Sequence, residues 1–382
     1  MISALAVAGY RSLRDVSVSL GQLNIVSGAN GSGKSNLYRA LRLLADAAQG
    51  RLIASLAAEG GLASTLWAGP EKISAQMKSG DIPIQGTRRS VPIALKLGFA
   101  SDTFGYAVDL GLPVPSRSRF EHDPEFKVET VWMGARATRG SLIAERRGSL
   151  VSMRREDDNS WREMMRNLAA NDSMMTQAAD LRDGFELVLL RERMRGWRFY
   201  DDLRTDRYAP ARRPQVGTFT PSLADDGRDV AAAVQTIFEI GDASAFEDTI
   251  ADAFPGAKID VNEAFEVEMR QHGLLRPLRA AELSEGTLRY ILLATALLTP
   301  RPPELMVLNE PEASLHVELI APLARLLRLA AGKTQIIVIS HATALIEALE
   351  DGDVSRHITL AKEFGETVVP FADQAAWKWP TR

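Results

Sequence analysis

A short segment near the start of the chain has the residue types and the spacing needed to hold phosphate groups. Residues 28–35, GANGSGKS, match the pattern GxxxxGK[ST]. In such a loop the glycines let backbone N–H groups turn inward, the lysine contacts phosphate oxygens and the serine hydroxyl ligates Mg²⁺. The pattern therefore predicts that Lys34 and Ser35 contact the phosphates and Mg²⁺ of a nucleotide. The alternative is an ordinary glycine-rich turn before a helix.

Two apolar segments near the end of the chain lead into polar side chains of the kind that phosphoryl transfer requires. Leu305–Leu308 precedes Asn309 and Glu310, and Gln335–Ile339 is followed by a serine and His341. Ligands bind at the carboxyl ends of strands in α/β sheets. Asn309 fits the role of holding the water shell of Mg²⁺, and Glu310 that of orienting an attacking water. Taken alone, an acidic residue before a proline also marks a turn, and a single histidine is more often structural.

A third segment, LSEGT at residues 283–287, precedes an apolar helical face. Ser284 is suited to cap that helix, and the start of the helix offers exposed N–H groups to an anion. By itself this is a capping motif that needs no other role.

The order of these segments along the chain resembles that of the ABC ATPases. Their phosphate loop, signature sequence, Walker B strand, D-loop and switch histidine correspond in order to GANGSGKS, LSEGT, LMVLNE, ASLH and the SH after Gln335–Ile339. Within this class the chain is most similar to the head ATPases of the RecF, SMC and OLD-like families and to a bacterial group of AAA or SMC-like ATPases. The start GYRSLR, the loop GANGSGKSN, the signature LSEGT and the phrase NEPEASLH carry the resemblance. These motifs lie only near the two ends of the chain.

The resemblance implies ATP and Mg²⁺ as cofactors and assigns roles to individual residues. Glu310 would be the catalytic base, His341 the sensor of the γ-phosphate, and Asn309 a metal contact through water. Ser284 and Gly286 would contact the nucleotide held by a second subunit, which implies an ATP-dependent homodimer. Lys34 would act in catalysis as well as in binding. The nucleotide-binding residues that the motifs imply are Arg11, Asn30, Gly31, Ser32, Gly33, Lys34, Ser35 and Asn36.

The chain departs from the usual pattern of these ATPases at three places. Asn309 stands where a Walker B aspartate is expected, and the signature has Glu285 and Thr287 where a transporter would show Gly and Gln. No glutamine stands out as a Q-loop residue, and Gln76 is the candidate.

The remaining segments must position these residues. Ile2–Val7 and Leu23–Ser27 are predicted strands, and Ser35–Ala48 has the apolar spacing of a helix. Pro92–Phe99 and the segments after it predict an antiparallel meander, whereas Trp161–Leu203 is mostly compatible with helix. Further segments of this kind are the strands Val16–Leu20, Gly105–Leu112 and Lys127–Met133, a hairpin in Ser141–Arg155, a loop at Tyr208–Pro221 and a helix after Gly227.

The expected fold class is α/β: a P-loop NTPase of the ABC ATPase type, with a mixed sheet core, an antiparallel β-subdomain and a helical second lobe. We expect residues 1–112 to form the N-terminal part of the ATPase core, with the phosphate loop. Residues 280–382 should form its C-terminal part, with the signature, the Walker B strand and the switch histidine. Residues 113–279 should form an inserted lobe of strands and helices.

Composition limits the classes of protein to which the chain can belong. Its 382 residues are 46% hydrophobic and 25% charged, the balance of a soluble globular protein. The absence of cysteine excludes disulfides, thiolate metal sites and cysteine nucleophiles. No signal peptide and no apolar stretch long enough to span a membrane are visible, so we expect a cytoplasmic protein with no membrane partner.

Three functions fit these observations. The first is an ATP-gated ATPase that acts on DNA in repair, genome maintenance or phage defence. The net charge of −4 does not indicate general nucleic-acid binding, but residues 116–215 hold slightly more basic than acidic side chains. A basic helix face could be lined by Arg191, Arg193, Arg195 and Arg198, or these residues could belong to an ordinary solvated face that also carries acidic residues.

The second function is an ATP-controlled module that regulates a partner protein such as a nuclease. The third, a transporter subunit, is disfavoured by the long strand-rich and arginine-rich stretch between Ser35 and Ser284.

The amide at Asn309 generates a prediction about Mg²⁺. An amide oxygen can accept a hydrogen bond from a water on Mg²⁺ but brings no negative charge to hold the ion. Replacing Asn309 by Asp should therefore lower the Mg²⁺ concentration that gives half-maximal ATPase activity. Equal Mg²⁺ dependence in the two proteins would show that Asn309 does not face the metal's water shell.

Overall fold

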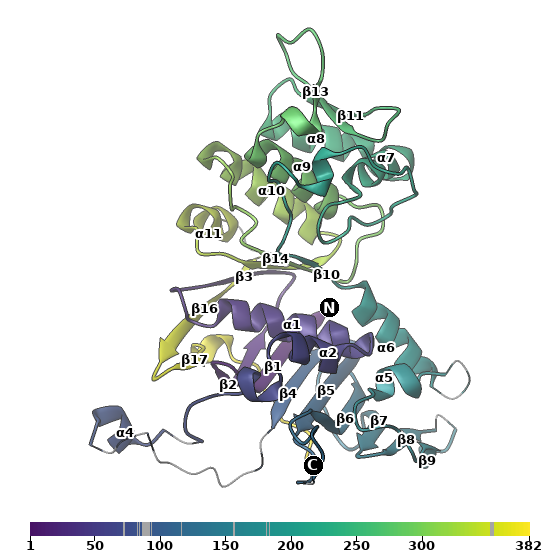
Figure 1. Ribbon diagram of the computed structural model, residues 1–382, viewed down its shortest axis with the longest axis vertical. Helices are drawn as coiled ribbons and strands as arrows, with labels where there is room; N and C mark the ends of the chain where they lie inside the picture. The colour runs from purple at the N-terminus through teal and green to yellow at the C-terminus, as the bar shows by residue number, and fades with distance from the viewer. Residues whose placement is uncertain are drawn as a thin grey trace. The chain divides into compact units, whose positions relative to one another are not determined.

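A computed structural model of the chain describes residues 1–71, 73–81, 83, 85, 92, 94–115, 117–155, 157–180, 182, 184–351 and 355–382. The chain divides into two compact units (Figure 1). Unit 1 comprises Met1–Gly21, Ser27–Trp197 and Ile358–Arg382, and unit 2 comprises Gln22–Val26 and Arg198–His357. The chain passes between them after Gly21, after Val26 within β3, after Trp197, and after His357 within β16. The expected three-part division at residues 112 and 279 stays a prediction.

Unit 1 is built on an eight-stranded antiparallel sheet with the strand order β2-β1-β4-β5-β6-β7-β8-β9. Its strands are β1 (Ile2–Tyr10), β2 (Leu13–Ser19), β4 (Leu95–Ser101), β5 (Phe104–Gly111), β6 (Glu125–Met133), β7 (Leu142–Arg147), β8 (Leu150–Arg154) and β9 (Trp161–Met165). Every residue of β5 is buried, which requires cover on both faces of the sheet. Helix α1 (Lys34–Ala48) contacts β1 and β4, and near the C-terminus Trp377 and Trp379 pack on the cluster that contains Ala100 and Trp132.

The other elements of unit 1 are short helices and one hairpin. They are α2 (Leu52–Ala58), α3 (Leu62–Thr65), α4 (Ala75–Ser79), α5 (Met174–Gln177), α6 (Phe185–Gly196), the 3₁₀ helix η4 (Phe371–Asp373), and the antiparallel strands β16 (Ser355–Glu363) and β17 (Glu366–Val368). Helix α1 packs against α2, α5 and α6. The leucines and alanines at helical spacing from Leu37 to Ala48 form its buried face, as the sequence predicted.

Unit 2 contains parallel strands covered by helices. β10 (Arg198–Tyr200), β14 (Leu305–Asn309), β15 (Gln335–Ile339) and the first part of β3 (Leu23–Gly28) pair in that order. Because β14 and β15 are buried on both faces, they are continuous apolar runs. The helices are α7 (Val230–Ile240), α8 (Ala243–Ala253), α9 (Glu285–Leu297), α10 (Ile320–Ala331) and α11 (Thr343–Glu350), with the 3₁₀ helices η1 (Pro210–Arg212), η2 (Ala280–Glu282) and η3 (Val317–Leu319).

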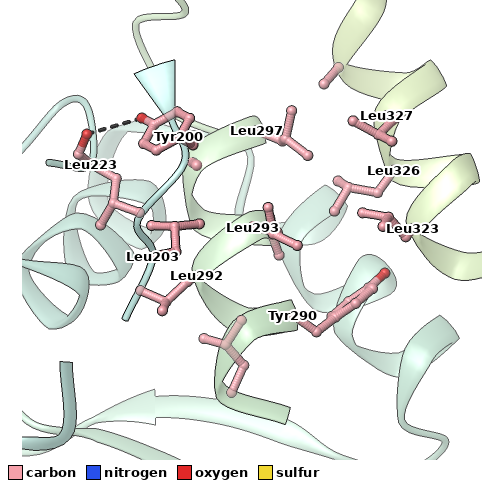
Figure 2. Close-up of a cluster of buried hydrophobic side chains, with 14 of the residues drawn as sticks. Tyr200, Leu203, Leu223, Tyr290, Leu292, Leu293, Leu297, Leu323, Leu326 and Leu327 are labelled. Atoms are coloured by element: carbon pink, nitrogen blue, oxygen red, sulfur yellow. Dashed lines mark hydrogen bonds between the residues drawn. The ribbon is translucent and has the colours of Figure 1, made fainter. Parts of the chain in front are cut away.

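Helix α9 lies at the centre of the core of unit 2. Figure 2 shows Leu293 and Leu297 of α9 pointing toward the leucines of α10, while Leu292 points toward Leu203. The hydroxyl of Tyr200 donates to the carbonyl of Leu223 at 3.0 Å in the same core. A small antiparallel sheet of β11 (Lys258–Val261), β12 (Val267–Arg270) and β13 (Leu278–Arg279) completes the unit.

The expectation that Trp161–Leu203 is mostly helical is wrong. Among the described residues of this segment only α5 and α6 are helical, whereas Trp161–Met165 is β9 and Arg198–Tyr200 is β10. Residues 161–165, WREMM, are compatible with helix, but their backbone groups pair with β8 at the edge of the sheet. Tertiary pairing therefore overrides a weak local preference. Leu181 and Asp183 of this segment, and Ile93 of the predicted strand Pro92–Phe99, lie outside the described residues.

A buried ion pair joins neighbouring strands of the sheet in unit 1. Nη1 of Arg146 lies 3.1 Å from Oε2 of Glu129, and neither side chain is exposed to solvent. The Tyr106 hydroxyl and the Met174 N–H each donate to this carboxylate at 2.8 Å. Burial, together with the negative charge of Glu129, raises the pKa of Tyr106. The remaining guanidinium donors of Arg146 reach backbone carbonyls, including that of Ala169 at 2.8 Å.

Replacing Arg146 by Met is expected to destabilise unit 1 by about 3–5 kcal/mol, because it leaves the charge of Glu129 buried without a partner. All six tryptophans of the chain belong to unit 1, so urea denaturation followed by tryptophan fluorescence reports on this unit. The control is Arg147→Met, whose partly exposed side chain pairs with Glu145 and whose loss should change stability by less than about 0.5 kcal/mol. Equal midpoints for the two variants would contradict the assignment of the buried pair as a structural requirement.

Candidate functional site

The phosphate loop in unit 1 has the backbone conformation that its glycines permit. Gly28, Gly31 and Gly33 all have positive φ angles, of 143°, 78° and 109°. Gly33 caps α1 and has no side chain that could accept from the N–H groups of the first turn of this helix. A helix start of this kind attracts anions. Asn30, Gly31 and Ser35 are exposed, whereas Ser32 and Gly33 are buried.

Lys34 points back into this loop. Its ammonium group donates to the carbonyls of Gly28 and Ala29, the latter at 3.2 Å, and the residue is only 8% exposed. The positive charge is thus held against the main chain of the loop, where the sequence predicts phosphate groups. Ser35 follows at the start of α1 and is exposed.

Hydroxyl and amide groups around the loop form a network that sequence reasoning did not find. Thr367 of β17 donates to the carbonyl of Ser32 at 2.7 Å and shares a hydrogen bond of 2.7 Å with Ser12. Asn36, expected to contact nucleotide, donates its amide N–H to Ser12 at 2.8 Å. No local motif signals this network, because Thr367 is far from the other residues in the sequence.

The structure gives Arg11 a partner within unit 1. Its φ angle is 47°, and its Nη2 lies 2.6 Å from Oε2 of Glu59. The hydroxyl of Tyr10 donates to the same oxygen at 2.7 Å. The role of Arg11 in nucleotide binding stays a prediction. Gln76 lies exposed on α4, and its proposed Q-loop role also stays a prediction.

In unit 2, the ends of β14 and β15 bring Glu310 and His341 together. Asn309 pairs with Ile339 in the parallel ladder, and the N–H of Glu310 donates to the carbonyl of Ile339 at 2.8 Å. Nδ1 of His341 lies 3.2 Å from Oε1 of Glu310, with side chains 57% and 44% exposed respectively. On the other side of β15, Val26 of β3 pairs with Ile339, and Gly28 follows Val26 by two positions in the chain.

Glu310 has a strained backbone that an arginine of α9 supports. Its φ of 48° lies in the left-handed region, which is unfavourable for a residue with a Cβ atom. The buried guanidinium of Arg289 donates to the carbonyl of Glu310 at 3.1 Å and to that of Leu203 at 3.1 Å. Burial lowers the pKa of Arg289, while the negative charges of neighbouring carboxylates, that of Glu312 first, act in the opposite direction. Sequence reasoning gave Arg289 no role.

The segment LSEGT forms the start of α9. Ser284 caps the helix, accepting from the N–H of Thr287 at 3.1 Å, and is itself exposed. A Cβ atom on Gly286 would lie 2.8 Å from the carbonyl oxygen of Ser314, so this position admits only glycine without a shift of the backbone. Arg212 also holds this region, since Nη1 donates to the carbonyl of Leu283 at 2.7 Å.

A second carboxylate lies buried beside this site. Glu312 is 8% exposed and accepts a hydrogen bond from the hydroxyl of Ser340. The same hydroxyl accepts from the N–H of Ala342 at 3.0 Å. The pair joins the turn after β14 to the turn after β15 and so fixes the two segments that carry Glu310 and His341.

Neither a cluster of metal-binding side chains nor a membrane-spanning helix is found in the described part of the chain. No three or more side chains of metal-binding type gather in one place among the described residues. Within the same residues, no helix has the length and apolar character needed to cross a membrane.

Comparison with known proteins relates the chain to a family of nucleotide-binding domains. Residues 23–347 match the family described as "AAA domain, putative AbiEii toxin, Type IV TA system". No curated protein matches the chain. The chain is similar to the SMC head domain from Thermotoga maritima, with 16% identity and a TM-score of 0.49 over 96% of this chain and 97% of that chain. It is also similar to an Smc head domain with an extended coiled coil, bound to the C-terminal domain of ScpA from Pyrococcus furiosus. The identity there is 14% and the TM-score 0.49, over 96% of this chain and 95% of that chain.

The strained backbone at Glu310 generates a stability prediction. Both Glu310→Gly and Glu310→Ala remove the bond to His341, but only glycine adopts a φ of 48° freely. The glycine variant should be more stable than the alanine variant by about 1 kcal/mol, which scanning calorimetry would detect as an unfolding temperature higher by a few degrees. At Asn309, the end of strand β14, the same pair of substitutions should give the opposite order, because glycine weakens a strand. If the Glu310→Ala variant were as stable as the Glu310→Gly variant, the backbone at residue 310 would not be strained.

Proposed function

Because the chain belongs to this AAA-domain family, we propose that it binds ATP with Mg²⁺ through residues 28–36 and hydrolyses it slowly, as an ATP-controlled switch. The observation that carries the proposal is the phosphate loop itself. Three of its glycines have positive φ angles, and the ammonium group of Lys34 is held against the inner carbonyls of the loop. If a phosphate bound there, Lys34 would exchange its hydrogen bonds to those carbonyls for stronger bonds to the charged phosphate oxygens.

The residues after β14 and β15 have the chemistry required for hydrolysis. A bound Mg²⁺ would supply positive charge to the phosphates, with Ser35 as a direct ligand and Asn309 as a contact through water. Glu310 would accept the proton of the attacking water. His341, hydrogen-bonded to Glu310 at 3.2 Å, would orient that carboxylate and sense the γ-phosphate. Both side chains are accessible enough to receive a ligand.

Slow hydrolysis is proposed for a physical reason. Asn309 brings no charge to the metal, so the ion is held mainly by the phosphates and by Ser35. Weak retention of Mg²⁺ lowers the fraction of protein in the reactive state. Such a rate suits a protein whose bound nucleotide controls an assembly.

An ATP-dependent homodimer is the assembly that the exposed start of α9 supports. Ser284 at the start of the helix is exposed, so this end of the helix can approach an anion on another molecule. The resemblance to ABC ATPases supports the proposal that this end of the helix meets the nucleotide of a second subunit.

One surface of unit 1 favours DNA as the molecule on which this ATPase acts. Arg154, Arg155, Arg162 and Arg182 line a surface pocket of about 580 Å³ beside β8 and α6, together with the acidic residues Asp157 and Glu186. Arginines at this density suit the phosphates of a nucleic acid. The arginine stripe expected on α6 is less suited, because Arg191 and Arg195 both pair with Glu192 and Arg193 bonds to Thr103.

The proposed dimer provides the test of function. Mg²⁺ with ATP should convert the Glu310→Gln variant from monomer to a stable dimer in light scattering, because binding is intact and hydrolysis is slowed. Lys34→Ala should stay monomeric, having lost the cation that contacts the phosphates. Ser284→Arg should bind ATP at its own loop but neither dimerise nor hydrolyse.

The parent protein should hydrolyse ATP, and the Lys34→Ala variant should not. Double-stranded DNA should raise the rate of hydrolysis in the parent, and this increase should become smaller as the salt concentration rises. One mass for every variant with and without nucleotide would refute the dimer. ATP binding by a folded Lys34→Ala variant with unchanged affinity would refute the role of the loop.

A further inference from the structure

The hairpin of β16 and β17 packs directly on the phosphate loop in unit 1. A Cβ atom on Gly28 would lie 2.2 Å from the carbonyl oxygen of Leu360, and one on Gly33 would lie 2.1 Å from Oγ1 of Thr367. Neither position has room for a side chain. Two of the glycines of the loop are therefore required by this hairpin as well as by their φ angles.

Thr367 is the central contact between the hairpin and the loop. The residue is 4% exposed, and its hydroxyl bonds to the carbonyl of Ser32 and to the hydroxyl of Ser12, each at 2.7 Å. Its backbone N–H donates to the carbonyl of Ser12 at 2.8 Å. Thr367 thus joins the β1–β2 turn, the hairpin and the loop at one point.

The strand pairing places Lys362 on the same face of the hairpin as Thr367. The two residues are directly opposite each other in the antiparallel ladder, so their side chains leave the sheet on the same side. Because Thr367 faces the phosphate loop, Lys362 faces it too. A distance supports this orientation: a Cβ atom on Gly31, an exposed residue of the loop, would lie 3.9 Å from Nζ of Lys362.

The acidic residues of the hairpin lie on its other face. Glu363 pairs with Glu366 in the ladder, one position along from Lys362 and Thr367, and so both point to the opposite side. Glu366 forms an ion pair with Arg14 there. The face directed at the loop therefore carries a positive charge and a hydroxyl group.

We propose that Lys362 is a second cationic residue of the nucleotide site, held next to Gly31 by the bonds of Thr367. The inference rests on the proposed function and adds a residue to that same site. Lys34 lies inside the loop with 8% exposure, whereas Lys362 is exposed and approaches from outside. The two charges act on the same polyphosphate from different sides. Thr367 is a positioning residue, because its hydroxyl contacts the loop.

The test measures affinity for MgADP and for the non-hydrolysable analogue MgAMP-PNP by calorimetric titration at low and moderate salt. Replacing Lys362 by Met should weaken both affinities by about three- to tenfold at low salt, with a smaller loss at higher salt, because a partly exposed charge is screened. Lys362→Arg keeps the charge and should bind like the parent. Lys333→Met, which removes an exposed lysine from unit 2, is the matched control and should also bind like the parent.

The role of Thr367 is tested by two substitutions of similar size. Thr367→Val removes the hydroxyl and should weaken nucleotide affinity, while Thr367→Ser keeps it and should restore most of the affinity. Parent-like affinity in a folded Lys362→Met variant at low salt would overturn the proposal, as would an equal loss in Lys362→Arg. A parent protein that binds neither nucleotide would instead refute the proposed function, so the two failures are distinguishable.

Discussion

The phosphate loop packs too closely against the hairpin near the C-terminus to admit a Cβ atom at Gly28 or Gly33. This steric constraint decides the path of the backbone between β3 and α1, and thereby the direction of the N–H groups and of Lys34. The residues that impose it, Leu360 and Thr367, are separated from the loop by almost the whole chain. The loop therefore reaches its final shape only when the two ends of the chain have come together, a contact of high sequence separation that carries a large entropic cost.

In unit 2, buried arginines hold segments that are far apart in the sequence by bonding to backbone carbonyls. Arg289 and Arg212 are both buried, and their guanidinium groups donate to backbone carbonyls of neighbouring segments, those of Glu310 and Leu283 among them. Since Arg289 belongs to α9, the helix that begins at Ser284 also supports the strained backbone of Glu310. A displacement of α9 would change the bonds to Glu310. The start of α9 and the carboxylate of Glu310 are in this way physically connected within one unit.

The arginine-rich middle of the chain shows how structural and functional charges differ. The guanidinium groups of α6 pair with Glu192 or bond to Thr103, and Arg146 neutralises Glu129 inside the sheet. These charges are used to hold the protein together. The arginines beside β8 gather around a pocket, and there the positive charge exceeds that of the two acidic residues that share it. Of these two arrangements among the described residues, the second is the one that would suit the proposed action on DNA.

The sequence by itself determined the features that depend on local pattern. The phosphate loop, the amphipathic helix after it, the apolar strands that end at Asn309 and before His341, and the cap at Ser284 all follow from residue types at fixed short spacings. The tertiary structure alone decided that WREMM is a strand, because β8 supplies the hydrogen-bond partners. It alone also decided that Arg212 and Arg289 hold carbonyls and that Thr367 and Lys362 face the loop. These roles depend on contacts between residues far apart in the chain, and a threonine or an arginine carries no local signal of the partner that it will meet after folding.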